Sequence, residues 1–296
     1  MASGQDLKRR IRSVRNTRKI TKALELVASA RLRRAQARIE AMRPYADRMM
    51  ELMIGTARAS SSVRGLPLLQ RREEERTVAI LPLTGDRGLA GAFNAQVLRH
   101  ALALGRQLEG EGKRVRWLVS GRKGASTLRF RRFEVLQAWT GFSDRPAYAD
   151  AQALAHKVEE LYVGEEVDRI VLVYNHFVSP LVQEVVEQEV LPIPEHVLEA
   201  GDEERAAALL GDFIYEPEPE QILERLLPVY VETELYRALL ESAASEQGAR
   251  MTAMRNASKN AGDLIDTLTL AMNRARQAEI TQEILEVVAG ADALPA

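Results

Sequence analysis

The fold is decided by residues 222–289, which read ILERLLPVYVETELYRALLESAASEQGARMTAMRNASKNAGDLIDTLTLAMNRARQAEITQEILEVVA. Alternating steps of four and three residues, starting at Ile222, reach twenty positions, and sixteen of them are apolar. A repeat of 3.5 residues held over this length is typical of a supercoiled helix, because the same stripe always faces the partner. At about 1.5 Å per residue the helix would be about 100 Å long, so we expect a long partner helix.

A second long helix is predicted over residues 4–59. Its apolar stripe consists of Leu7, Ile11, Val14, Ile20, Leu24, Val27, Leu32, Ala35, Ile39, Met42, Ala46, Met49 and Met53, with a phase shift near Arg18. Pro44 lies inside the pattern and predicts a local bend, as does Pro228 in the C-terminal helix. Because the two helices lie at opposite ends of the chain with a compact segment between them, they must run antiparallel if they pair.

Between the two helices, short apolar runs alternate with helical patterns, which favours a small α/β domain with a mainly parallel sheet. The expected strands are residues 77–83, 114–119, 133–139 and 168–177, and the expected helices are residues 93–108, 122–128 and 148–161. Residues 181–191 alternate apolar and polar side chains, as an antiparallel edge strand does. We therefore expect an N-terminal coiled-coil helix (1–60), a Rossmann-like α/β domain (75–195) and a C-terminal coiled-coil helix (212–296), with an acidic linker at 192–211.

The composition excludes several kinds of site. The chain has 296 residues and no cysteine, so disulfides, thiol nucleophiles and cysteine metal sites are absent. Its four histidines stand alone in the sequence, and we predict neither a metal nor a cofactor. No run of about 20 apolar residues is present, so we predict no membrane-spanning helix.

The net charge of −1 conceals a strong separation of charge along the chain. Residues 1–38 carry twelve Lys or Arg against two acidic residues, whereas residues 158–224 carry eighteen Asp or Glu against two Arg. The basic segment is interpreted as a solvated helix face that meets an acidic partner. The alternatives are an organelle transit peptide and a nucleic-acid-binding helix, although no aromatic residue precedes Tyr45 for stacking on bases.

The first expected strand is followed by a glycine-rich segment, Thr84–Asn94, which reads TGDRGLAGAFN. A strand, a glycine-rich turn and a helix is the setting of a phosphate cradle. The glycine spacing is G-x-x-G-x-x-G, however, and Asp86 would repel a phosphate. We favour a tight structural turn over a nucleotide site, and we predict no catalytic residue in this chain.

Three segments resemble the gamma subunit family of F-type ATP synthases. Residues 280–291 (ITQEILEVVAGA) match the family signature I-T-x-E-x-x-E-x-x-x-G-A at every fixed position, and residues 11–25 and 86–91 (DRGLAG) are also similar to the family. The resemblance implies a non-catalytic rotor stalk, in which an antiparallel coiled coil turns inside a ring of alternating alpha and beta subunits.

The resemblance also implies partners and a location. The foot of the stalk would rest on the epsilon subunit and the c-ring, and membrane association would occur only through the complex. The absence of a chloroplast-type thiol switch favours a bacterial protein at the cytoplasmic face of the plasma membrane, with no role in nucleic-acid binding.

Six residues match family positions that contact the beta subunit. Arg276 and Gln277 resemble a pair that hydrogen-bonds an acidic catch loop of beta, and the remaining four positions are Leu24, Arg250, Thr281 and Glu283. From the residues alone, Arg250 is the one charged residue in the apolar stripe, so we expect it to reach solvent or to pair with a carboxylate of a partner.

Overall fold

The computed structural model describes residues 4–60, 65–194, 197 and 217–292. Its elements are α1 (Gly4–Ala59), β1 (Thr77–Pro82), α2 (Phe93–Gly110), β2 (Arg114–Ser120), α3 (Arg122–Phe130), β3 (Val135–Trp139), α4 (Tyr148–Val163), β4 (Arg169–Phe177), β5 (Gln183–Leu191) and α7 (Pro219–Asp292). The predicted strands and short helices are confirmed, with ends that differ by a few residues. Most of the predicted acidic linker lies outside the described residues.

The strands form one five-stranded sheet in the order β3-β2-β1-β4-β5. The first four strands are parallel, and β5 runs antiparallel to β4 at the edge, as the alternating pattern of residues 181–191 predicts. The parallel strands are near-continuous apolar runs because both faces of the sheet are covered by helices. A mixed α/β architecture with long terminal helices is therefore confirmed.

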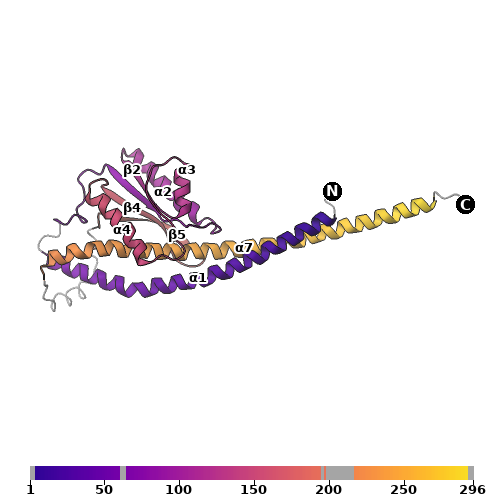
Figure 1. The fold of residues 1–296 in the computed structure, drawn as a ribbon, viewed down its shortest axis with the longest axis horizontal. Coiled ribbons are helices and arrows are strands. Elements are labelled where there is room, and N and C mark those ends of the chain that lie inside the picture. Colours follow the sequence, from indigo (N-terminus) through magenta and orange to yellow (C-terminus); the bar gives the residue numbers. More distant parts are fainter. Residues whose placement is uncertain (1–3, 61–64, 195–196, 198–216, 293–296) are drawn as a thin grey trace. The chain divides into compact units, whose positions relative to one another are not determined.

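Helices lie on both faces of the sheet, with α2 and α3 on one face and α4 on the other (Figure 1). Each face has its own apolar core. On one face, Ile80, Trp117 and Val173 pack with side chains of α2 and α3. On the other face, alternate strand residues such as Leu81 and Leu172 pack with α4, with the first part of α7 and with Met53 and Ala57 of α1. The beginning of α7 is thus a structural layer of the α/β domain.

This packing explains why α7 is apolar on more than one side. The predicted stripe through Ile222, Leu226 and Val229 is half-buried, whereas the neighbouring Leu223 and Leu227 are completely buried against the sheet. A helix that contacts partners on two sides needs two apolar faces. A single stripe of 3.5-residue period therefore describes only part of this segment.

The chain consists of two compact units. The first is formed by residues 29–250, and the second by residues 1–28 together with residues 251–296, so each long helix contributes to both units. In the first unit, Ser60 beside the end of α1 donates a hydrogen bond to Glu220 at the start of α7 (2.8 Å). In the second unit, Arg255 of α7 donates to Glu25 of α1 (3.1 Å). Within the first unit, Arg31 of α1 and Gln247 of α7 also bind one carboxylate, that of Asp144, so residue numbers that rise along α1 meet numbers that fall along α7 there, as an antiparallel pair requires.

One part of the predicted α1 stripe is wrong. Ile20 and Val27 are 60% and 49% exposed, and the buried side chains are instead those of Thr21, Glu25 and Ala28. Glu25 can occupy the buried face because Lys22 and Arg255 both bind its carboxylate at about 3 Å. A charged side chain with two such partners satisfies its hydrogen bonds without water. The two internal prolines, Pro44 and Pro228, both lie inside uninterrupted helices.

Candidate functional site

The glycine-rich segment after β1 is a tight structural turn at the carboxyl end of the sheet. The side-chain oxygen of Asn94 accepts a hydrogen bond from the backbone N–H of Gly85 (2.7 Å), and Leu89 and Gly91 have φ angles of 64° and 56°. Thr84 bonds the end of β2 through Ser120 and accepts the N–H of Gly124 in α3 (2.9 Å). These bonds fix the turn against the neighbouring strand and helix.

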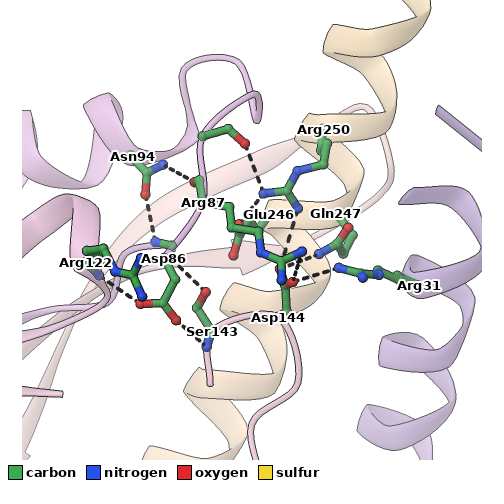
Figure 2. A network of polar contacts seen from close by, with 12 residues as sticks. Arg31, Asp86, Arg87, Asn94, Arg122, Ser143, Asp144, Glu246, Gln247 and Arg250 are labelled. Carbon is green, nitrogen blue, oxygen red and sulfur yellow. Dashed lines mark hydrogen bonds and ion pairs between the residues drawn. The ribbon is translucent and has the colours of Figure 1, made fainter. Parts of the chain in front are cut away.

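The carboxylate of Asp86 occupies the position that a bound anion would take. It accepts hydrogen bonds from the backbone N–H groups of Arg122 (3.0 Å), Gly141 (2.8 Å) and Ser143 (3.1 Å), as Figure 2 shows in part. Arg122 is the first residue of α3, where unsatisfied N–H groups favour a negative charge. The chain supplies this anion itself, so the structure favours the predicted structural turn over a phosphate cradle.

A second carboxylate, that of Asp144, connects the loop after β3 to both long helices. It binds Arg31 of α1 (2.7 Å), Arg87 of the glycine-rich turn (3.3 Å) and the amide of Gln247 in α7 (3.2 Å). Figure 2 shows these side chains converging on Asp144 from three elements. One carboxylate thus fastens the edge of the sheet to α1 and α7.

Arg250 completes the connection from the side of α7. Its guanidinium forms an ion pair with Glu246 one turn earlier and donates to the backbone oxygen of Gly88 in the turn (3.2 Å). Its second terminal nitrogen lies 3.9 Å from Asp144. We call the group of Arg31, Asp86, Arg87, Ser143, Asp144, Glu246, Gln247 and Arg250 the polar joint.

The Glu246–Arg250 pair is the buried part of the polar joint. The side chains of Glu246 and Arg250 are 1% and 10% exposed. Burial raises the pKa of Glu246, while the charge and hydrogen bond of Arg250 act in the opposite direction. A buried pair of this kind resists loss of one partner, because the remaining charge would be left without compensation. The joint therefore connects the loops of the sheet to α1 and α7 through ion pairs and hydrogen bonds.

The expectation that Arg250 reaches solvent or a partner's carboxylate is not what the structure shows, because its ion pair is with Glu246 of the same chain. The physical reason is proximity: a carboxylate four residues earlier on a helix lies on the same face. Contact of Arg250 with a beta subunit stays a prediction.

The other five predicted contact residues belong to the unit formed by residues 1–28 and 251–296. Leu24 is half-buried, and the remaining four are exposed on α7. The hydroxyl of Thr281 donates to the backbone oxygen of Gln277 (2.9 Å), so it is occupied within the helix. Among the described residues, the side chains of Arg276, Gln277 and Glu283 have no hydrogen-bonding partner. They are available to another protein.

Sequence reasoning missed Arg31, Ser143, Asp144 and Glu246. Asp144 and Ser143 lie in a loop that has no motif, and Glu246 looks like an ordinary surface charge of a helix. The one available signal was that Arg250 is the charged residue of the stripe and has Glu246 four residues before it, beside the stripe. An arginine at a stripe position with a carboxylate one turn away indicates a buried ion pair when a third element covers it.

Neither a metal cluster nor a membrane span is found where the structure can be described. No group of three or more His, Asp or Glu residues there could hold a metal ion. No helix in the same residues is long and apolar enough to cross a membrane.

Comparison with known proteins identifies the family. The family model described as ATP synthase matches residues 3–294. A protein of Rubrobacter xylanophilus called ATP synthase gamma chain is 49% identical over all of both chains. The chain belongs to the ATP synthase gamma chain family. A gamma chain of Moorella thermoacetica is 45% identical, over 99% of this chain and 100% of that protein.

A solved structure agrees with this assignment. A chain in the central stalk and c-ring structure of Tetrahymena thermophila mitochondrial ATP synthase is 27% identical, with a TM-score of 0.59. The match covers 81% of this chain and 99% of that chain. Membership of the gamma chain family favours the stalk interpretation over a nucleic-acid-binding protein.

Proposed function

We propose that this chain is the rotor stalk of a bacterial ATP synthase, which carries torque between the c-ring and the catalytic beta subunits. The observation that carries the proposal is the single helix α7. It begins at Pro219, adds Leu223 and Leu227 to the core of the α/β domain, and continues without interruption to Asp292. A torque applied to the α/β domain therefore acts directly on the helix that would enter the alpha–beta ring.

The polar joint supports the same proposal. To transmit torque, the α/β domain must not rotate about the long helices to which it is attached. Ion pairs and hydrogen bonds fix one orientation of the domain, whereas packed apolar surfaces alone can slide past each other more easily. Asp144 and the Glu246–Arg250 pair hold the sheet loops to both long helices. The joint would therefore limit twisting of the α/β domain about α7.

The C-terminal end of α7 carries exposed apolar side chains, as a protein-binding surface does when its partner is absent. Ile280, Ile284, Leu285, Val287 and Val288 are between 45% and 71% exposed. Apolar side chains gathered on one exposed helix end indicate a protein partner. We propose that this end lies within the ring of alpha and beta subunits and that Arg276 and Gln277 hydrogen-bond beta, together with contacts of Leu24, Thr281 and Glu283.

The remaining parts of the proposal concern architecture and partners. α1 and α7 would form an antiparallel coiled coil, and the parallel strand order β3-β2-β1-β4 is consistent with a Rossmann-like domain. The domain limits would be 1–60, 75–195 and 212–296. The epsilon subunit and the c-ring would bind the foot, peripheral to the cytoplasmic face of the plasma membrane, and the chain would catalyse no reaction itself.

The proposal is tested by reconstitution with alpha and beta subunits of the Rubrobacter relative. We expect this chain to co-purify with them and to restore proton pumping when the membrane sector is added, measured by quenching of a pH-sensitive dye in vesicles. A chain truncated before Ile284 keeps its α/β domain and should pump less per ATP hydrolysed. Failure of the full chain to co-purify with alpha and beta would contradict the proposal.

A further inference from the structure

Two adjoining hollows lie beside the polar joint, on the side formed by α1, α7 and the loop before α4. The first is a groove of about 450 Å³ lined by Arg31, Arg34, Ala35, Arg38, Asp144, Arg145, Pro146, Leu240 and Ala243. The second is a groove of about 440 Å³ lined by Arg38, Ala41, Met42, Tyr45, Tyr148 and Tyr236. Arg38 lines both, so the two hollows are neighbours. Each has the size of a small-molecule site.

The first groove carries an excess of positive charge. Four arginines line it against one carboxylate, and that carboxylate, Asp144, is already bound by Arg31 and Arg87. Over the parts of the chain that the structure describes, the guanidinium groups of Arg34, Arg38 and Arg145 have no carboxylate or hydrogen-bonding partner. Planar guanidinium groups bind phosphate oxygens through paired hydrogen bonds. The groove thus has the chemistry of a polyphosphate site.

The arginines are placed by the fold. Arg31, Arg34 and Arg38 follow one another at spacings of three and four, so they share one face of α1. Arg145 approaches from the loop that Asp86 and Asp144 hold in place. The cations therefore come from two elements that the polar joint fixes relative to each other.

The second groove is aromatic. The rings of Tyr148 and Tyr236 meet edge to face, with centroids 5.5 Å apart and an interplanar angle of 82°. The hydroxyl of Tyr148 donates to Glu232 (2.7 Å), which holds that ring in place, while Tyr45 is 52% exposed at the rim. Aromatic rings of this kind offer stacking surfaces to a nucleobase.

We propose that the two grooves form a binding site for a nucleoside di- or triphosphate. Its phosphates lie among Arg31, Arg34, Arg38 and Arg145, and its base lies against Tyr45, Tyr148 and Tyr236. An inorganic polyphosphate would leave the aromatic groove empty, and an acidic peptide would use the row of arginines without needing the tyrosines. The joining of a cationic and an aromatic hollow at Arg38 favours a nucleotide over both. The site is separate from the glycine-rich turn, where Asp86 takes the anion position.

The test is titration calorimetry of the full-length chain with ATP, ADP and inorganic triphosphate at low salt. We expect ATP to bind with a dissociation constant of about 10–100 μM, and inorganic triphosphate to bind about tenfold more weakly. Arg34→Gln and Arg38→Gln should each weaken ATP about tenfold, and Tyr45→Ala should remove the preference for ATP over triphosphate. These side chains are exposed or half-buried, so the variants should keep the circular dichroism spectrum of the wild type.

Arg33→Gln is the matched control, because Arg33 is exposed on the same helix but lines neither groove. It removes the same charge and should change ATP affinity less than twofold. Absence of ATP binding at about 1 mM would overturn the proposal. Equal binding of ATP and triphosphate, equal effects of Arg33→Gln and Arg34→Gln, or tighter binding of a glutamate-rich peptide than of ATP would also overturn it. None of these results bears on the rotor function, which is tested in the assembled complex.

Discussion

Replacing Arg250 by methionine tests whether the polar joint is a buried ionic connection. Methionine keeps the unbranched apolar stem of arginine but is shorter and removes its charge and its donors to Glu246 and Gly88. Glu246, with a side chain 1% exposed, then has to remain charged without its cation or take up a proton. Proton uptake is the less costly course in a dry environment.

The expected loss of folding free energy follows from the free energy needed to protonate Glu246. The carboxyl of Glu246 has an ordinary pKa of 4.5, which lies 2.5 units below pH 7. At about 1.36 kcal/mol per unit, neutralising it costs about 3.4 kcal/mol at pH 7 and about 1.4 kcal/mol at pH 5.5. The first value agrees with the range of about 3–5 kcal/mol for breaking a buried ion pair from one side.

The sign of the pH dependence is fixed by the direction of the pKa shift. In the variant, burial without Arg250 raises the pKa of Glu246 in the folded state above its value in the unfolded chain. The folded state then binds the proton more tightly, so the variant is closest to wild type at low pH. Burial already raises this pKa in the wild type, so the stability of the variant relative to wild type falls as the pH rises between the two folded-state pKa values, both of which lie above 4.5.

The assay is urea unfolding followed by tryptophan fluorescence at pH 5.5 and pH 7. Both tryptophans, Trp117 and Trp139, lie in the sheet and report on the α/β domain. Arg250→Met with Glu246→Gln should lose the pH dependence and recover part of the stability, because no buried charge remains. Arg255→Met is the control: this arginine is 58% exposed in its pair with Glu25, so the loss should stay below about 1 kcal/mol. A pH-independent cost below about 1 kcal/mol for Arg250→Met would refute the reasoning.

Three further predictions concern other residues. Gly121 has φ +97°, and an added Cβ would lie 2.0 Å from the carbonyl oxygen of Thr84, so Gly121→Ala should abolish folding or lower the stability by more than about 3 kcal/mol in circular dichroism melting. Gly112 has φ +81° but open space around it, so Gly112→Ala should cost only about 1 kcal/mol. Equal melting temperatures for the two variants would contradict this account. Asp86→Ala removes the acceptor of three backbone N–H groups, and should cost about 2–4 kcal/mol and speed hydrogen exchange in residues 140–144, whereas unchanged exchange would show that the carboxylate does not hold the loop. Arg276→Ala combined with Gln277→Ala should leave stability within about 0.5 kcal/mol but reduce proton pumping per ATP in the complex, and unchanged pumping would refute the contact with beta.

Much of the fold could be predicted because its signals are local. The strand at residues 169–177 contains the apolar run 170–174, which follows Asp168 and Arg169, and its predicted limits differ by one residue from the observed ones. The long helices follow from the spacing of apolar residues, which sterics impose directly. Neither kind of signal requires knowledge of what packs where.

The second face of α7 could not be predicted by the same means. The buried residues Leu223, Leu227 and Tyr230 each lie one residue after a stripe position. From the sequence alone they cannot be told apart from the other apolar residues of a long helix. Only the position of the sheet gives them a partner. Thr21 and Glu25 show the opposite case, in which polar residues fill a buried face. The hydroxyl of Thr21 donates to the backbone oxygen of Arg18, and Lys22 and Arg255 bind the carboxylate of Glu25.

The polar joint was least accessible to sequence reasoning. Asp144 is one carboxylate in a loop, and it is important because it binds Arg31, Arg87 and Gln247, which are far from it in the sequence. Such a group is defined by tertiary structure alone. The exposed residues Arg276 and Gln277, in contrast, came from a local motif and need a partner protein before their role can be observed.

The central claim, that this chain rotates inside a ring of alpha and beta subunits, is tested most directly by watching it turn. Because the chain has no cysteine, Ser126→Cys on the exposed side of α3 gives a single attachment point on the α/β domain. A bead fixed there, with the alpha and beta subunits held on a surface, should rotate in one direction when ATP is supplied. A bead that stays still while the same complexes hydrolyse ATP would contradict the account.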